Sequence, residues 1–181
     1  MSDILNLEKQ LVFYRSYHYN TVNVLIHSVF VPTILFTSIG ILTPIKLSKD
    51  ANPFFNLATL MTIGYAGFYL LLDVTAGLIT TPILYLFLKT NVDGTQYVDG
   101  WFGYMVWIFI IAWIVQFIGH GVFEKRAPAL LDNLVQALVL APYFVLFEGL
   151  FLIGWRKDLK QRIDTNAASN IALWKEKKSV K

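Results

Sequence analysis

Five stretches of this chain are almost continuously apolar, and polar residues gather at their ends. They occupy residues 23–45, 54–72, 74–88, 101–123 and 134–155. A helix of about 20 mostly apolar residues spans the ~30 Å hydrocarbon core of a bilayer, so these stretches predict membrane helices. Strands of a membrane barrel would alternate apolar and polar residues, and these stretches do not. We therefore expect an all-α fold, a polytopic helical membrane bundle.

Two of the five segments fit a full crossing less well than the others, which leaves four or five crossings open. Residues 74–88 are short and contain Pro82, and Pro142 interrupts residues 134–155. A proline inside a helix removes a backbone hydrogen bond and breaks or kinks the helix. A segment interrupted in this way can also enter the membrane and return, so a re-entrant arrangement is the alternative.

The remaining parts of the chain are short connections and polar ends. Residues 46–53 and 89–100 are rich in Asp, Asn, Gly and Pro, a composition that predicts turns. Residues 4–17 carry apolar side chains at helical spacing, which indicates an amphipathic helix on the membrane surface. Residues 156–181 are polar and basic and predict a surface helix or a disordered end.

Composition agrees with a chain dissolved in lipid. Hydrophobic residues make up 56% of the 181 residues and charged residues only 15%, whereas soluble domains carry about 25% charged residues. The mean hydropathy is +0.55. The absence of cysteine excludes a disulfide framework and a zinc–thiolate site. We expect the lipid bilayer as a partner and no nucleic acid, and no cleavable signal peptide is predicted at the N-terminus.

All three histidines lie at the edges of membrane-length segments. Asn23 and His27 are four residues apart and share a helix face. His18 precedes His27 by nine residues, which at about 100° per residue places the two rings on opposite sides of a straight helix. A helix break at residues 19–21, with Asn20 or Thr21 capping the next helix, would let His18 fold back toward His27.

The third histidine belongs to a second polar constellation. Gln116, His120 and Glu124 are spaced by four and lie on one stripe of a helix. Gly119 and Gly121 flank His120 and leave room for another helix or a ligand to approach. Placing polar groups inside lipid costs free energy, so a stripe of polar residues at this position indicates a structural or functional role.

A metal site is one such role. Neutral imidazoles with a carboxylate and without thiolates suit iron(II), zinc or manganese, and composition does not choose among them. The alternative is structural, since a histidine at a helix end commonly caps it or reaches to the interface. A shared metal also requires His27 and His120 to lie at one membrane face, so residues 74–88 must cross too or form a re-entrant pair with their neighbour.

Two stretches carry a resemblance to a known family: "FYRSYHYNTVNVLIHSVFVPTILF" and "WIVQFIGHGVFEKRAPALLDNLVQALVLAPYFVLFE". The chain resembles the fungal 2-hydroxy fatty acid dioxygenases of the endoplasmic reticulum, over residues of about 11 to 152. The resemblance implies an iron(II)-dependent α-oxidation that uses dioxygen to shorten a 2-hydroxy long-chain fatty acid by one carbon, without 2-oxoglutarate. It also implies a multi-pass endoplasmic-reticulum protein acting in phytosphingosine degradation.

The family's motifs assign roles to individual residues. His-x8-His falls on His18 and His27, and Gly-His-x3-Glu falls on Gly119, His120 and Glu124. The resemblance thus implies three histidine ligands, with Glu124 as a fourth ligand or as a partner that orients a histidine. Around these residues we expect two supporting amides and three candidate partners for the substrate carboxylate: Asn23 and Gln116, and Arg15, Lys125 and Arg126.

We therefore expect an integral membrane catalytic domain over residues 1–155, followed by a basic polar tail over residues 156–181. The concentration of Lys and Arg after Gly154 favours a cytosolic C-terminus. The metal face would then be lumenal if residues 134–155 cross fully, and cytosolic if they are re-entrant. The rival function is a non-enzymatic lipid-binding or assembly protein with structural histidines. A two-iron fatty acid hydroxylase would need many more than three histidines.

Overall fold

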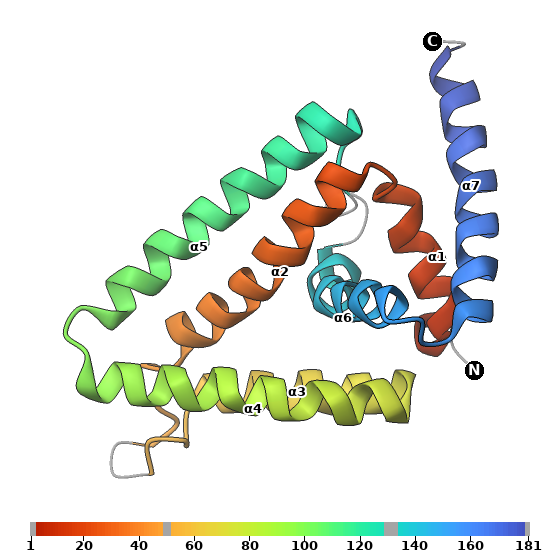
Figure 1. Ribbon diagram of the computed structural model, residues 1–181. Coiled ribbons are helices and arrows are strands. Elements are labelled where there is room, and N and C mark those ends of the chain that lie inside the picture. Colours follow the sequence, from red (N-terminus) through yellow and green to blue (C-terminus); the bar gives the residue numbers. More distant parts are fainter. Residues whose placement is uncertain (1–2, 49–51, 129–133, 180–181) are drawn as a thin grey trace. The chain divides into compact units, whose positions relative to one another are not determined.

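The computed structural model describes residues 3–48, 52–128 and 134–179, and this part of the chain is all-helical (Figure 1). It contains seven α-helices, a 3-10 turn and a π-helical turn. In chain order the elements are η1 (Asp3–Leu5), α1 (Leu7–Tyr17), α2 (Thr21–Leu42), α3 (Leu57–Leu72), α4 (Val74–Tyr97), α5 (Trp101–Ile118), η2 (Gly119–Glu124), α6 (Leu134–Leu152) and α7 (Lys157–Ser179). The all-α prediction is confirmed for these residues.

The helices group into two compact units. The first comprises Met1–Ser28 and Gln116–Lys181, and the second comprises Val29–Val115. The three histidines and every other candidate site residue belong to the first unit. In that unit α7 lies along α1, and α6 also contacts α1 (Figure 1).

The second unit is built around a helical hairpin. Asp73 ends α3 and begins α4, and its carboxylate accepts a hydrogen bond from the Ala76 amide at 2.9 Å. The two helices therefore fold back on each other (Figure 1). They pack so closely at Gly77 that a Cβ there would lie 2.7 Å from the backbone of Leu70.

The turn predicted over residues 89–100 is wrong, because α4 continues to Tyr97. Asn91 is fully buried, and its amide donates to the carbonyls of Phe36 and Phe87 at 3.0 and 2.9 Å. Its Oδ1 accepts a bond from the indole nitrogen of Trp101 at 3.0 Å. These tertiary contacts thus keep the segment helical, although its composition favours turns. The other predicted turn, over residues 46–53, is present where it is described, and residues 49–51 lie outside the described residues.

The predicted interruption at Pro142 is also wrong, because α6 runs through it. Pro32 and Pro82 likewise lie inside α2 and α4. Neighbouring helices and local adjustments can satisfy the backbone groups that a proline frees. The predicted N-terminal helix is confirmed as α1, while its place on a membrane surface stays a prediction, and the C-terminal segment forms a helix rather than a disordered end.

Among the described residues, two helical segments are long and apolar enough to cross a membrane. They are Thr21–Leu42 and Trp101–Glu124, and Leu57–Leu72 and Leu138–Leu152 are shorter apolar helices. The core helix of a soluble protein would be mostly buried, whereas only 22% of the most apolar window of Trp101–Glu124 is buried. The apolar surface of this helix faces outward.

Candidate metal centre

The three histidines converge in the first unit, although they come from three different elements. His18 ends α1, His27 lies in the second turn of α2, and His120 lies in η2. Their ring centroids are 4.5 Å apart for His18 and His27, and 4.8 Å apart for each of the other two pairs. All three side chains are buried. One nitrogen from each ring lies within 4.8 Å of the other two.

A break between α1 and α2 brings His18 and His27 together, as the sequence predicted. Asn20 caps α2, because its Oδ1 accepts the backbone amides of Val22 and Asn23 at 2.9 and 3.3 Å. His18 leaves the helical conformation, with φ −134° and ψ 72°. The nine-residue separation therefore does not point the rings apart, and this prediction is confirmed.

Hydrogen bonds to the backbone fix which nitrogen of His18 and of His27 is available. Nδ1 of His18 donates to the Tyr14 carbonyl, and Nδ1 of His27 donates to the Asn23 carbonyl, both at 2.9 Å. A carbonyl can only accept, so Nδ1 carries the hydrogen and Nε2 keeps the lone pair. Metal-binding histidines typically show this arrangement, with the second ring nitrogen held by a carbonyl or carboxylate.

The nitrogens fit a metal ion. Nε2 of His18 and Nδ1 of His120 are buried and have no hydrogen-bond partner in the described part of the chain. Buried polar atoms normally have a partner, so orphaned ones require an explanation. Three nitrogens that share one metal at ~2.1 Å lie about 3.0–3.6 Å apart, so from their present limit of 4.8 Å the rings must draw together by about 1 Å or more when the metal binds.

The surroundings keep His18 neutral, which is the form that binds a metal. Burial lowers its pKa well below 6.5, and the neighbouring rings of His27 and His120 lower it further. The ring of Tyr14 stacks on that of His18 with centroids 4.0 Å apart and planes 8° from parallel. The ring of Phe144 packs in turn against that of Tyr14, with their centroids 4.1 Å apart. Neither aromatic residue was predicted as part of the site from the sequence; the spacing of four between Tyr14 and His18 was the available signal.

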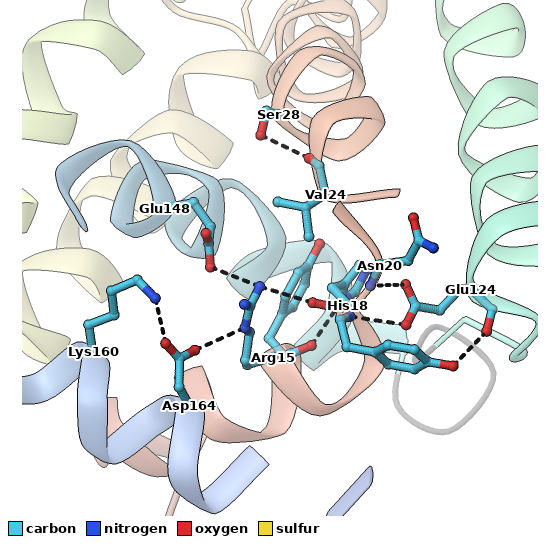
Figure 2. Close-up of polar contacts among 11 residues, drawn as sticks. Arg15, His18, Asn20, Val24, Ser28, Glu124, Glu148, Lys160 and Asp164 are labelled. Carbon is cyan, nitrogen blue, oxygen red and sulfur yellow. Dashed lines mark hydrogen bonds and ion pairs between the residues drawn. The ribbon is translucent and has the colours of Figure 1, made fainter. Parts of the chain in front are cut away.

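Glu124 is fully buried and holds the α1–α2 break (Figure 2). Its Oε1 accepts the backbone amide of Tyr19 at 3.0 Å, and its Oε2 accepts the backbone amide of Asn20 at 3.2 Å. Oε2 also accepts the side-chain amide of Asn23 at 2.9 Å. The carboxylate is thus bound by three donors from the segment that separates His18 from His27.

The end of α5 is a π-helical turn that carries His120 and Glu124. Such turns are rare and occur frequently at functional sites. A Cβ on Gly119 would lie 2.5 Å from Oδ1 of Asn23, so only glycine permits this approach to α2. Gly121 is exposed, and a Cβ there would meet nothing within 4 Å. Of the two flanking glycines, Gly119 is the one that a close approach requires.

The two predicted supporting amides are both buried. Asn23 contacts Glu124 through its Nδ2, while its Oδ1 lacks a hydrogen-bond partner among the described residues. Gln116 is 7% exposed, and its Nε2 is likewise buried and unpartnered there. The structure therefore joins Asn23 to the Glu124 carboxylate and places Gln116 one turn before His120.

The predicted cations occupy three different settings. Arg15 donates to Asp164 from Nε at 3.1 Å and to the His18 carbonyl from Nη1 at 3.2 Å (Figure 2). Arg126 donates to the Ser16 carbonyl at 2.7 Å. Lys125 is exposed and has the left-handed backbone conformation that ends η2, with φ 53°.

Comparison with known proteins agrees with the resemblance found in the sequence. The family model described as "2-hydroxy-palmitic acid dioxygenase Mpo1-like" matches residues 4–152. The 2-hydroxy-palmitic acid dioxygenase MPO1 of Saccharomyces cerevisiae is 45% identical over 161 residues, which are 89% of each chain. No solved structure matches. The chain belongs to the family of 2-hydroxy-palmitic acid dioxygenase Mpo1-like proteins.

Proposed function

We propose that this chain is an iron(II)-dependent dioxygenase of the endoplasmic-reticulum membrane. It would shorten 2-hydroxy long-chain fatty acids by one carbon in the degradation of phytosphingosine. The observation that carries the proposal is the convergence of His18, His27 and His120: one nitrogen of each ring lies within 4.8 Å of the other two, and two buried ring nitrogens of this cluster have no hydrogen-bond partner among the described residues. Membership of the family supports the substrate class.

In this proposal the three imidazoles hold the metal, and the residues around them hold the imidazoles. The Tyr14 and Asn23 carbonyls orient the rings of His18 and His27. Iron(II) bound there would supply open coordination positions for dioxygen and for the carboxylate and hydroxyl oxygens of the substrate. The overall conversion balances with dioxygen alone, since a 2-hydroxy acid and O2 give the acid shorter by one carbon, CO2 and water.

Glu124 acts in the proposal as a residue that orients the site rather than as a fourth ligand. Its carboxylate already accepts the amides of Tyr19 and Asn20 and the side chain of Asn23, which occupy three of its about four acceptor sites. Charge-assisted hydrogen bonds of this kind are about twice as strong as neutral ones. Gln116, buried one turn before His120, is the second supporting amide.

The substrate carboxylate needs a cationic partner, and the three candidates differ in what already surrounds them. Arg15 lies against Asp164 and Glu148, and Arg126 lies against the Tyr17 ring, 3.7 Å from its centroid. These contacts favour a role for both arginines in fixing the protein segments around the centre, rather than in binding the substrate. Lys125 is exposed, whereas both arginines are half-buried, and it follows Glu124 directly in the chain, so we favour it for the carboxylate on accessibility.

Membrane embedding is supported by the apolar side chains that the helices turn outward. On α5 the strongly exposed ones include Phe102, Trp107, Ile111 and Ile114. Exposed apolar surface on this scale marks a membrane or a protein interface. The α3–α4 hairpin carries similar residues and returns the chain to the side from which it came. With α2 and α5 as single crossings, the start of α2 and the end of α5 then lie at one membrane face.

The test is metal analysis of the purified protein, followed by a product assay. We expect roughly one iron per chain and conversion of 2-hydroxy-palmitic acid to pentadecanoic acid in the presence of iron(II) and dioxygen. Palmitic acid, which lacks the 2-hydroxyl group, should not be converted. Folded protein that binds no metal and forms no product would overturn the proposal in favour of the non-enzymatic lipid-binding protein.

A further inference from the structure

Helix α7 lies beside α1 (Figure 1), and polar contacts join the two helices from Glu8 to Ser16 of α1. One face of α7 is buried through Leu159, Ile163 and Ala167, which recur every four residues. The polar contacts advance along both helices in the same direction, so the helices run parallel. These contacts join Arg162 to Glu8, Asp164 to Arg15 and Asn170 to Ser16.

The contact between Asp164 and Arg15 connects α7 to His18, a candidate metal ligand. Asp164 accepts a hydrogen bond from Nε of Arg15 at 3.1 Å, and Nη1 of the same guanidinium donates to the His18 carbonyl at 3.2 Å (Figure 2). Glu148 of α6 lies 3.7 Å from Nη1. His18 is non-helical and follows the last residue of α1. The helix therefore fixes the backbone of His18 less firmly than it fixes the backbone of a residue in its interior.

A second contact joins α7 to the segment that carries His120. The guanidinium of Arg126 lies 3.7 Å from the ring centroid of Tyr17 and 4.8 Å from that of Trp174. The backbone amide of Arg126 donates to the His120 carbonyl at 3.4 Å. Helix α7 thus reaches both the α1 end and the η2 end of the candidate centre.

We propose that Asp164 is a positioning residue for the metal centre, acting through Arg15 on the backbone of His18. This inference rests on the proposed function. It places α7, which begins beyond residue 152 where the family match ends, within the metal-binding unit. A fixed guanidinium holds the His18 carbonyl, and the carbonyl sets the direction in which the stacked imidazole points.

The test compares the full-length protein with Asp164→Asn, which keeps the size of the side chain and removes its charge. Arg162→Gln is the matched control, because it removes the exposed ion pair with Glu8 on the same α1–α7 interface, away from His18. Lys160→Gln is a second control, because it removes the other ion-pair partner of Asp164 and leaves Arg15 untouched. Iron(II) affinity is measured against a competing chelator, and thermal unfolding of each variant is measured beside it.

We expect Asp164→Asn to bind iron(II) about 3- to 10-fold more weakly, which is less than the ~10–100-fold loss typical when a direct partner of a ligand ring is removed. Both controls should keep the wild-type affinity, and all three variants should unfold at similar temperatures. Combining Asp164→Asn with Arg15→Gln should weaken binding no more than Arg15→Gln alone, because the two residues act through one contact.

A readout without metal completes the test. In metal-free protein, the amides of residues 17–20 should exchange hydrogen faster in Asp164→Asn than in Arg162→Gln. Equal affinity and equal exchange in these two variants would overturn the inference and leave the proposed function standing. If the folded wild-type protein bound no metal, the proposed function would fall, and the inference with it.

Discussion

Replacing Gly119 with alanine should disturb the metal centre without touching any ligand. A Cβ at this position would lie 2.5 Å from Oδ1 of Asn23, and 3.5 Å from two side-chain atoms of Ile26. Ordinary contact begins at 3.4 Å, so the pair must separate by about 0.9 Å. Asn23 is fully buried and its Nδ2 is bonded to Glu124, so moving its side chain aside strains that bond.

The magnitude follows from two opposing effects. Alanine favours a helix over glycine by about 1 kcal/mol, which would stabilise the protein in the absence of a clash. Overpacking costs about 1–3 kcal/mol. Moving Asn23 also strains its 2.9 Å bond to Glu124, and a hydrogen bond to a charged group contributes about 1.5–3 kcal/mol. We expect a net loss of about 2 kcal/mol, which lowers the unfolding temperature by about 4–8 °C in a chain of this size.

The centre should respond as well, because the Asn23 carbonyl holds Nδ1 of His27. Loss of an orienting partner typically weakens metal binding by ~10–100-fold. Gly121→Ala is the control: nothing lies within 4 Å of its Cβ, so its unfolding temperature should stay the same or rise. Thermal unfolding and iron titration of both variants check the prediction. Equal behaviour of the two alanine variants would refute the reasoning.

Three further predictions concern the site itself. His18→Ala, His27→Ala and His120→Ala should each lose iron and turnover while accumulating normally; full activity of one variant would exclude that residue as a ligand. Glu124→Gln should lose about 1–3 kcal/mol of stability, because an NH2 group would replace an oxygen that accepts N–H donors, and iron should bind ~10–100-fold more weakly. Unchanged unfolding and iron content in that variant would contradict both effects. For the metal-free protein, the free energy of unfolding should fall as pH drops below 6.5. The reason is that His18 takes up a proton there in the unfolded chain, whereas burial lowers the pKa of His18 in the folded protein and keeps the ring neutral. Denaturant titrations at pH 8 and pH 5 measure this, and a slope unaffected by His18→Ala would argue against it.

The convergence of His18 and His27 could be predicted because its causes are local. Nine residues are half a turn out of phase on a helix, so shared ligation demanded a break between them. Asn20 is a residue that caps helices, and it stands where the break was needed. The four-residue spacing of Asn23 and His27 likewise placed both on one face of α2.

The contacts of Glu124 could not be predicted in the same way. Two of its three donors are the backbone amides of Tyr19 and Asn20, and backbone amides have no sequence signature. The π-helical turn that ends α5 has no distinctive composition either, since glycine near a helix end also predicts an ordinary cap. The stripe of polar residues at spacing four was therefore visible, whereas the partner of each polar group was not.

Longer-range packing explains the failure over residues 89–100. Asn, Asp and Gly favour turns when their side chains bond to the local backbone. Here the Asn91 side chain, besides its bond to the Phe87 carbonyl one turn earlier, bonds across to Phe36 and Trp101, and Gly94 lies so close to Trp101 that a Cβ would be 2.3 Å from the ring. The residues that suggested a turn are those that let helices approach each other.

The position of the histidines at helix ends agrees with the chemistry proposed for the site. A 2-hydroxy fatty acid has its reacting carbon beside a charged carboxylate and its tail in the hydrocarbon core of the bilayer. His27 lies six residues into α2, which at about 1.5 Å per residue is about 9 Å along the helix from Thr21. A site near the boundary of the apolar segment would let the carboxylate stay close to water while the acyl chain remains in lipid. A site at the middle of the same helix would require the carboxylate to enter the bilayer core, where a charge is strongly disfavoured.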